Sequence, residues 1–218
     1  LKKVFADLGL MSKPEFEIEE TGSPIIPSPW GEINTLTASY GHGIAVTPLQ
    51  LVSAVSTVVN GGVRVKPSLV MKAKDDDKHM SDVRVLSKET SLKMRQLMRL
   101  VVTNGTARKA EVPGYFIGGK TGTAQKNVHG HYVADKRMAI FVGVFPINNP
   151  KYAVLVLVDE PNPNKDSYGY ATAGWVAAPA VGRVVSGMGS ILGMRPRPDD
   201  PEISEPLKQF IKNVKSEH

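Results

Sequence analysis

The sequence contains no cysteine and no long apolar run. The absence of Cys excludes a disulfide framework and thiolate zinc sites, and it is only weakly compatible with an oxidising compartment. No stretch approaches the roughly 18 apolar residues of a membrane span, and no signal peptide is visible. The 218 residues, 41% of them hydrophobic and 22% charged, suit one globular domain, or most of one, with a sizeable core.

The net charge of +6 lacks the clustering that a polyanion-binding protein shows. Lys and Arg are scattered among acidic residues, and no basic block is interleaved with aromatics. This pattern favours a solvated basic surface, and we predict no nucleic-acid partner.

The pattern of the first residues predicts that Leu1 lies inside a helix rather than before its first turn. Leu1, Val4, Phe5 and Leu8 fall on one helical stripe, and Gly9 is a suitable C-terminal cap. No initiator Met and no N-cap precede them. We therefore expect the chain to continue upstream of Leu1.

A second helix is sharply delimited in "TPLQLVSAVSTVVNGG". Thr47 is the expected cap, Pro48 suits the first turn, Gln50 occupies the capping-box position and Asn60 begins the stop signal. The helix is apolar almost all round, which predicts a buried central helix.

The remaining elements indicate an α+β fold. A helix is predicted over "SKETSLKMRQLMRLVVTNG", followed by extended segments at 115–125, 137–147 and 151–161 and a closing helix at 175–193. The turn "INNP" is short enough to join the last two extended segments as an antiparallel hairpin. We assign residues 1–194 to the domain and 195–218 to a Pro-rich linker and a short amphipathic helix. The apolar stripe of that tail helix consists of Leu207, Phe210, Ile211 and Val214.

The stretch "GYFIGGKTGTAQ", residues 114–125, fits two incompatible motifs. From Gly114 to Thr121 it satisfies G-x-x-x-x-G-K-[ST], a phosphate-binding P-loop, and "AVLVLVDE" resembles a Walker B strand. From Lys120 to Gly122 it contains K-T-G, a motif of the serine acyl-transfer enzymes that recognise penicillin.

The neighbouring residues favour K-T-G. A P-loop needs a strand before its first Gly and a helix that starts at its Lys-Thr. Gly114 follows "AEVP", and "GTAQKNVHGHYV" is poor helix material. In a strand, Lys120 and Gly122 share one face while Thr121 and Thr123 share the other. Gly122 would then leave room for a ligand against the backbone.

Longer segments resemble one family in their text, order and spacing. They are "SYGHGIAVTPLQLVSAVSTVVNGGVRVKPSLV", "GTARKAEVPGYFIGGKTGTAQK", "FVGVFPINNPKYAVLVLVDEP" and "AAPAVGRVV". Residues 1 to about 194 resemble class B penicillin-binding proteins, above all the division-septum peptidoglycan D,D-transpeptidases of Gram-negative bacteria. The resemblance implies a mainly antiparallel sheet flanked by helices, related to the serine β-lactamases. It also implies a periplasmic domain of an inner-membrane-anchored protein.

The resemblance also implies roles for the K-T-G residues. These enzymes cleave the terminal D-Ala of a stem peptide through an acyl-serine, and β-lactams acylate the same serine. Lys120 would supply positive charge near the terminal carboxylate and help to poise a neighbouring hydroxyl for proton transfer. Thr121 and Thr123 are the hydroxyls that would hold the terminal carboxylate, and Gly122 is the fourth substrate-binding residue.

Other residues are weaker candidates for the wall of the cleft. They are Tyr40, His42, Gln125, Tyr132, Tyr168 and Tyr170. "NKDSYGYATAGW" departs from the usual glycine-flanked aromatic pair of the family. His129 and His131 have the spacing of a metal pair, but no third ligand is evident, so we predict no metal and no cofactor.

Two of the family's three motifs are absent. Neither S-x-x-K, which holds the nucleophile and its base, nor S-x-N occurs in the chain, and both would precede Leu1 in the family's order. We therefore expect the chain to be the C-terminal part of a transpeptidase domain, lacking the serine and inactive alone. Its partners would be stem peptides, β-lactams, the missing part of its own domain and other division proteins.

Three other classes of function stay open. A penicillin sensor or a β-lactamase relative is the first, although "YGHGIAVTPLQL" argues against it. The others are a non-enzymatic binding module that docks through the tail stripe and, more distantly, a P-loop nucleotide-binding module.

Overall fold

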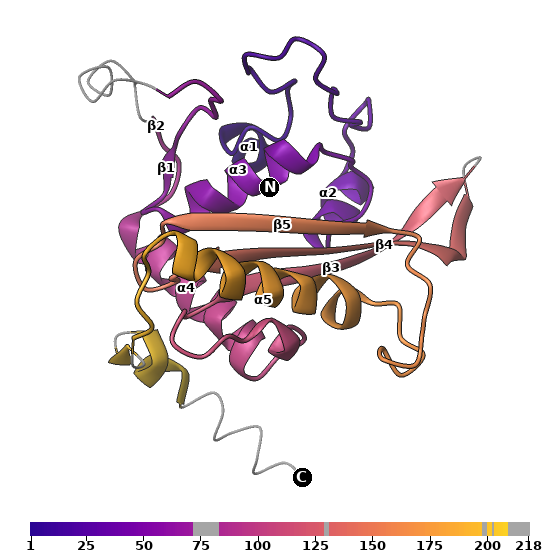
Figure 1. Ribbon diagram of the computed structural model, residues 1–218. Helices are drawn as coiled ribbons and strands as arrows, with labels where there is room; N and C mark the ends of the chain where they lie inside the picture. Colours follow the sequence, from indigo (N-terminus) through magenta and orange to yellow (C-terminus); the bar gives the residue numbers. More distant parts are fainter. Residues whose placement is uncertain (72–82, 129–130, 198–199, 202, 209–218) are drawn as a thin grey trace. The chain divides into compact units, whose positions relative to one another are not determined.

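A computed structural model describes residues 1–71, 83–128, 131–197, 200–201 and 203–208 (Figure 1). The chain divides into two compact units, Leu1–Ser91 and Leu92–His218. No helix within the described ranges is long and apolar enough to cross a membrane.

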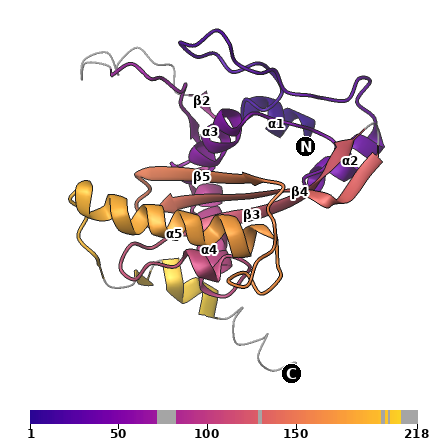
Figure 2. The same ribbon diagram turned by 45° about the vertical axis from the view of Figure 1, so that its right-hand side comes forward.

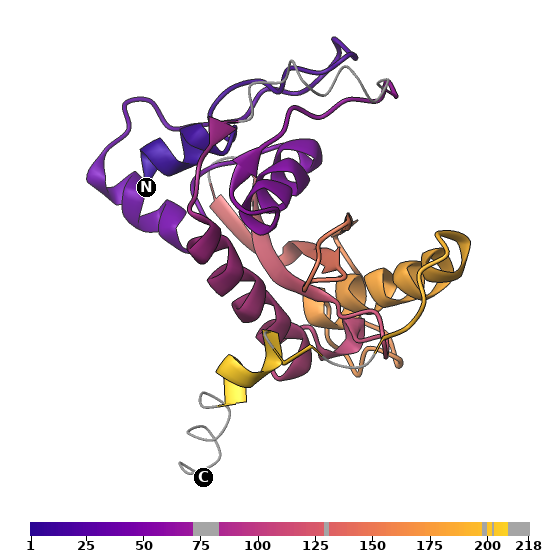
Figure 3. The same cartoon turned by 90° about the vertical axis from the view of Figure 1, so that its left-hand side faces the viewer.

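The first unit is mainly helical. It contains α1 (Lys2–Asp7), α2 (Glu32–Ser39), α3 (Pro48–Val59) and the antiparallel pair β1 (Val63–Arg64) and β2 (Val83–Arg84). Extended segments near residues 15–17 and 66–69 run alongside each other (Figure 3), and Lys66 Nζ lies 2.9 Å from Glu15 Oε2.

Helix α3 begins as the sequence predicts. Thr47 Oγ1 accepts a hydrogen bond from the Gln50 N–H, and Gln50 Oε1 accepts one from the Thr47 N–H at 3.0 Å. The amide of Gln50 also donates to the carbonyls of Gly9 and Ser12, which ties α3 to the segment after α1. In this chain most apolar side chains of α3 are only half-buried. Gln50 and Thr57 are among its buried residues.

The second unit consists of a three-stranded antiparallel sheet and its helices. Its elements are α4 (Lys88–Thr103, whose first turn belongs to the first unit), η2 (Arg108–Ala110), β3 (Gly118–Val128), β4 (His131–Phe145), β5 (Tyr152–Asp159) and α5 (Ala173–Ile191). The strand order is β3-β4-β5. Helix α5 lies along one face of the sheet (Figures 1 and 2).

The core of the second unit lies between α5 and the sheet. Phe141 and Phe145 of β4 are fully buried with Ala177 and Val181 of α5, and Val102 of α4 belongs to the same cluster. This packing explains how α5 forms despite its internal Pro179, since burial of an apolar face outweighs helix propensity. The α+β class and the "INNP" hairpin between β4 and β5 are confirmed.

The chain after α5 packs on the second unit. The Arg197 N–H donates to the Gly114 carbonyl at 3.0 Å, and Ile203 and Leu207 are buried. The other three members of the predicted tail stripe, Phe210, Ile211 and Val214, lie outside the described residues. The domain boundary at residue 194 stays a prediction.

A buried arginine joins three segments of the second unit. Arg99 of α4 is 8% exposed, and its guanidinium donates two hydrogen bonds, of 2.5 and 2.9 Å, to the Glu111 carboxylate. It donates a third, of 2.8 Å, to the Ile117 carbonyl, directly before β3. A planar guanidinium satisfies all three at once, whereas an ammonium does not have this geometry.

We expect Arg99→Met to lower the free energy of unfolding by about 3 kcal/mol, because it leaves a partly buried carboxylate and a carbonyl without their donor. Arg99→Lys should cost less but remain destabilising. Arg183→Met, which removes the same charge from an exposed position on α5, serves as the control and should be nearly neutral. Denaturant unfolding followed by circular dichroism measures all three, and equal stability of Arg99→Met and the control would contradict the assignment.

Candidate active site

The K-T-G residues lie within β3, and the pairing register fixes their faces. Thr121 is opposite Phe141 and Thr123 is opposite Ala139 on β4. Directly opposed residues of an antiparallel pair share a face. The two threonines therefore lie on the face that α5 covers, and Lys120 lies on the opposite face, as the alternation predicts.

β3 is the edge strand of its sheet in the part of the chain that is described, since its only sheet partner there is β4. Lys120 is exposed, and its ammonium donates to the carbonyl of Thr121 at 2.6 Å. Added to Gly122, a Cβ atom would meet nothing within 4 Å. No neighbouring atom of the described chain excludes a side chain at this position. The backbone of Gly122 is therefore open to a ligand or to another part of the protein.

Both threonine hydroxyls are held in place. Thr123 Oγ1 accepts the backbone N–H of Ala173, the first residue of α5, at 3.1 Å. Thr121 Oγ1 lies 2.7 Å from Thr106 Oγ1. Because the Thr123 oxygen already accepts a hydrogen bond, its own O–H is left to donate.

A pocket of about 670 Å³ opens on the threonine face. It is lined by Gly105, Thr106, Arg108, Lys109, Thr121, Thr123, Thr172, Gly174 and Trp175. The lining comes from the segment between α4 and η2, from η2, from β3 and from the start of α5. Sequence reasoning identified only Thr121 and Thr123 of this set.

The pocket residues that were missed carry only a faint signal in the sequence. Thr106 and Lys109 lie 15 and 11 residues before Thr121 and Lys120, and only the fold brings them to the strand. Trp175 was expected merely to open the last helix. Its two nearby tyrosines are the one local feature that could have drawn attention to it.

The predicted cleft-wall residues differ in what the structure says of them. The Tyr170 ring stacks on Trp175 at 5.2 Å and 17°, and the Tyr168 ring meets Trp175 edge-on at 5.4 Å, so both border the pocket through the tryptophan. Gln125 is exposed on β3 beside the register shift after it. The backbone of Tyr132 lies in β4, but its side chain is outside the described part.

Tyr40 and His42 belong to the first unit, where their rings are 5.3 Å apart. Because the two units are not placed relative to each other, Tyr40 and His42 are not assigned to the pocket. His131 is the first residue of β4, and His129 is outside the described residues. The described residues contain no cluster of three metal-ligating side chains.

The P-loop hypothesis is wrong. Lys120 and Thr121 lie inside a strand, whereas a P-loop places them at the start of a helix. The acidic residues of the supposed Walker B strand bind Lys126 instead: its Nζ is 2.9 Å from Asp159 Oδ1 and 3.0 Å from Glu160 Oε1.

Those hydrogen bonds, first to Asp159 and then to Glu160, raise the pKa of Lys126. A raised pKa in the folded state means that the stabilisation is fully present at neutral pH. The contribution of Lys126 is lost as the pH rises through the raised value.

The chain belongs to the penicillin-binding protein transpeptidase domain family, whose model matches residues 1–182. It is similar to class B members of that family. A probable peptidoglycan D,D-transpeptidase FtsI from Caulobacter vibrioides is 36% identical over 204 residues, which cover 89% of this chain and 34% of that protein. Stage V sporulation protein D from Bacillus subtilis is also 36% identical, over 90% of this chain and 31% of its own length. The chain thus spans about a third of these curated relatives.

Solved structures agree with this assignment. The apo transpeptidase domain of penicillin-binding protein 3 from Burkholderia pseudomallei matches with a TM-score of 0.79 at 30% identity, over 91% of this chain and 59% of that chain. Penicillin-binding protein 3 from Mycobacterium tuberculosis, complexed with ampicillin, matches with a TM-score of 0.80 at 27% identity, over 91% and 47%.

Two glycines of β3 make a matched test of the site. A Cβ on Gly119 would lie 2.4 Å from the Val142 carbonyl oxygen and 2.5 Å from Phe141 Cζ. We expect Gly119→Ala to cost about 2–3 kcal/mol of stability through overpacking, and Gly122→Ala to cost less than about 0.5 kcal/mol. Chemical denaturation of the two variants gives the comparison, and a large cost at Gly122 would show that its openness is not available to a ligand.

Proposed function

We propose that this chain is the C-terminal part of the transpeptidase domain of a peptidoglycan D,D-transpeptidase that cross-links stem peptides during septal cell-wall synthesis. The observation that carries the proposal is the pair of anchored threonine hydroxyls on an edge strand, beside an open glycine and next to a pocket. Family membership and the names of the relatives give the reaction class.

The acyl-transfer chemistry assigns a task to each K-T-G residue. Thr123 donates its O–H to the terminal carboxylate of the stem peptide or of a β-lactam, and Thr121 supports it. The backbone N–H of Thr123 is one oxyanion donor, and the loss of such a donor costs roughly 3–4 kcal/mol in related chemistry. Gly122 lets the substrate lie against the strand.

Lys120 acts on the opposite face of β3 from the threonine hydroxyls. There its ammonium provides fixed positive charge and poises a neighbouring hydroxyl for proton transfer. The nucleophile and its lysine base belong to S-x-x-K, and neither this motif nor S-x-N occurs in this chain. The full-length protein supplies them from upstream, and β-lactams acylate the same nucleophile.

The same proposal covers the location and the partners. The resemblance to peptidoglycan D,D-transpeptidases supports a periplasmic domain of a protein that is anchored in the inner membrane. Other division proteins would be partners of the full-length protein. Hydrolysis of β-lactams at a rate useful for resistance would favour the β-lactamase-related alternative.

In the full-length protein, we expect Lys120→Ala to slow acylation by benzylpenicillin at least about a hundredfold, because a fixed charge in a water-poor cleft has no substitute. Stopped-flow measurement of the second-order acylation constant tests this. Lys126→Ala is the matched control: it removes the same charge from the same strand, and it should change the constant less than about threefold. Near-normal acylation of Lys120→Ala would overturn the role given to this lysine.

The chain alone should not become labelled by a fluorescent penicillin. An acyl-serine requires a serine with an adjacent base, and no serine here has a lysine three residues downstream. Labelling should appear when a separately made upstream piece that bears S-x-x-K and S-x-N is added, and peptide mapping should place the label on that piece. A penicilloyl group on any serine of residues 1–218 would mean that the motif assignment is wrong.

A further inference from the structure

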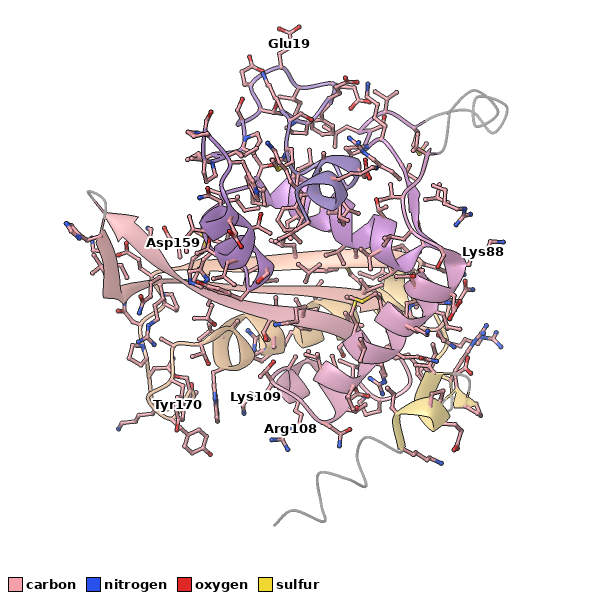
Figure 4. The ribbon with its side chains drawn as sticks, turned by 180° about the vertical axis from the view of Figure 1, so that it is seen from behind. Glu19, Lys88, Arg108, Lys109, Asp159 and Tyr170 are labelled. Atoms are coloured by element: carbon pink, nitrogen blue, oxygen red, sulfur yellow. The ribbon has the colours of Figure 1, made fainter. Side chains whose placement is uncertain are left out.

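Two cationic side chains line the pocket on the threonine face of β3. Arg108 and Lys109 of η2 both line the pocket, and the lining contains no Asp or Glu. Across the described part of the chain, neither residue forms an ion pair with a carboxylate. In Figure 4 both side chains project from the same edge of the second unit as Tyr170.

Lys109 has a defined position over an aromatic wall. Its Nζ lies 4.1 Å from the centre of the Trp175 ring, close enough for a cation–π interaction. Trp175 is itself packed against the rings of Tyr168 and Tyr170. This contact holds the Lys109 ammonium at the wall of the pocket.

The backbone that carries the two cations is fixed as well. Ala107 and Ala110, on either side of them, are fully buried in the core of the second unit. The Ala107 N–H donates to the Val101 carbonyl, and the Ala110 N–H donates to the Ala107 carbonyl. Gly182 of α5 comes so close to Ala110 that a Cβ there would lie 3.2 Å from its carbonyl oxygen. The site is thus built on packed elements.

Lys120 does not provide charge at this pocket. It alternates to the other face of β3 and is not among the lining residues. The hydroxyls of Thr121 and Thr123 give direction to a bound carboxylate but no net charge. The positive end of α5, which begins at Ala173, adds only a partial charge. Among the residues that line the pocket, formal positive charge comes from Arg108 and Lys109 of η2.

We propose that Lys109, assisted by Arg108, is the charged half of a carboxylate-binding subsite, and that Thr123 and Thr121 are its hydrogen-bonding half. The ligand is the terminal carboxylate of a stem peptide or of a β-lactam, so the proposal rests on the proposed function. Lys109 and Arg108 are substrate-binding residues here and take no part in proton transfer. Lys120 keeps the role proposed for it above, on the face of β3 opposite the threonines.

The test compares an anionic ligand with its neutral analogue in the full-length protein. Benzylpenicillin methyl ester lacks the negative charge of this carboxylate and carries one additional methyl group. The measured quantity is the ratio of their second-order acylation constants. For Lys109→Gln we expect a roughly tenfold loss with benzylpenicillin and less than a twofold change with the ester, and Lys109→Arg should restore most of the ratio. The double variant with Arg108→Gln should lose more.

Controls separate charge at the pocket from charge elsewhere. Lys151→Gln removes an exposed lysine that does not line the pocket, and its ratio should equal that of the unaltered protein. Trp175→Leu should lower the ratio by releasing Lys109. Raising the salt concentration should reduce the ratio of the unaltered protein far more than that of the double variant, because exposed charges are screened. Thermal unfolding of each variant confirms that it is folded.

The outcomes distinguish the two proposals. If benzylpenicillin does not acylate the unaltered protein, the proposed function fails and the subsite falls with it. If acylation is normal but Lys109→Gln and the double variant keep the ratio of the unaltered protein, the subsite is wrong while the function stands. A loss of equal size with both ligands would also overturn the subsite, since it would indicate distortion of the site rather than recognition of charge.

Discussion

The arrangement of the second unit depends on one buried guanidinium. Arg99 donates to Glu111 and to the Ile117 carbonyl, and so links α4, the segment after η2 and the residue that precedes β3. A buried charge is tolerated only when its hydrogen bonds are satisfied, which makes the relative position of these three segments a condition of folding. The pocket is lined by residues between Arg99 and Glu111 and by residues of β3, so the hydrogen bonds of Arg99 help to fix the geometry of the pocket.

Helix α5 and the sheet complete the site in a different way. The burial of Phe141 and Ala139 against α5 fixes which face of β3 carries the threonines. The N-terminus of α5 then meets Thr123, so that packing between apolar surfaces sets the position of a polar group. Strand β3 and the helix that covers its threonine face belong to one structural unit, whereas Tyr40 and His42 belong to another.

Much of the fold is readable from the sequence because its signals are local. The capping box of α3, the "INNP" hairpin and the two faces of K-T-G all follow from a few neighbouring residues. The rest of the pocket is not readable, because Thr106, Lys109 and Trp175 join Thr121 only through tertiary contacts. The apolar pattern of α3 likewise shows that the helix needs cover, but it does not show what covers it. The assignment of K-T-G to a strand required the context on both sides of the motif.

The contact between Thr106 and Thr121 has a consequence for comparisons among relatives. The hydroxyl of Thr121 is oriented by a residue that no family motif includes. A relative with an intact K-T-G but with valine at position 106 would pass every motif search, although its Thr121 hydroxyl would have lost its partner. Divergence in drug response between such proteins would then arise at a position that a motif alignment treats as background.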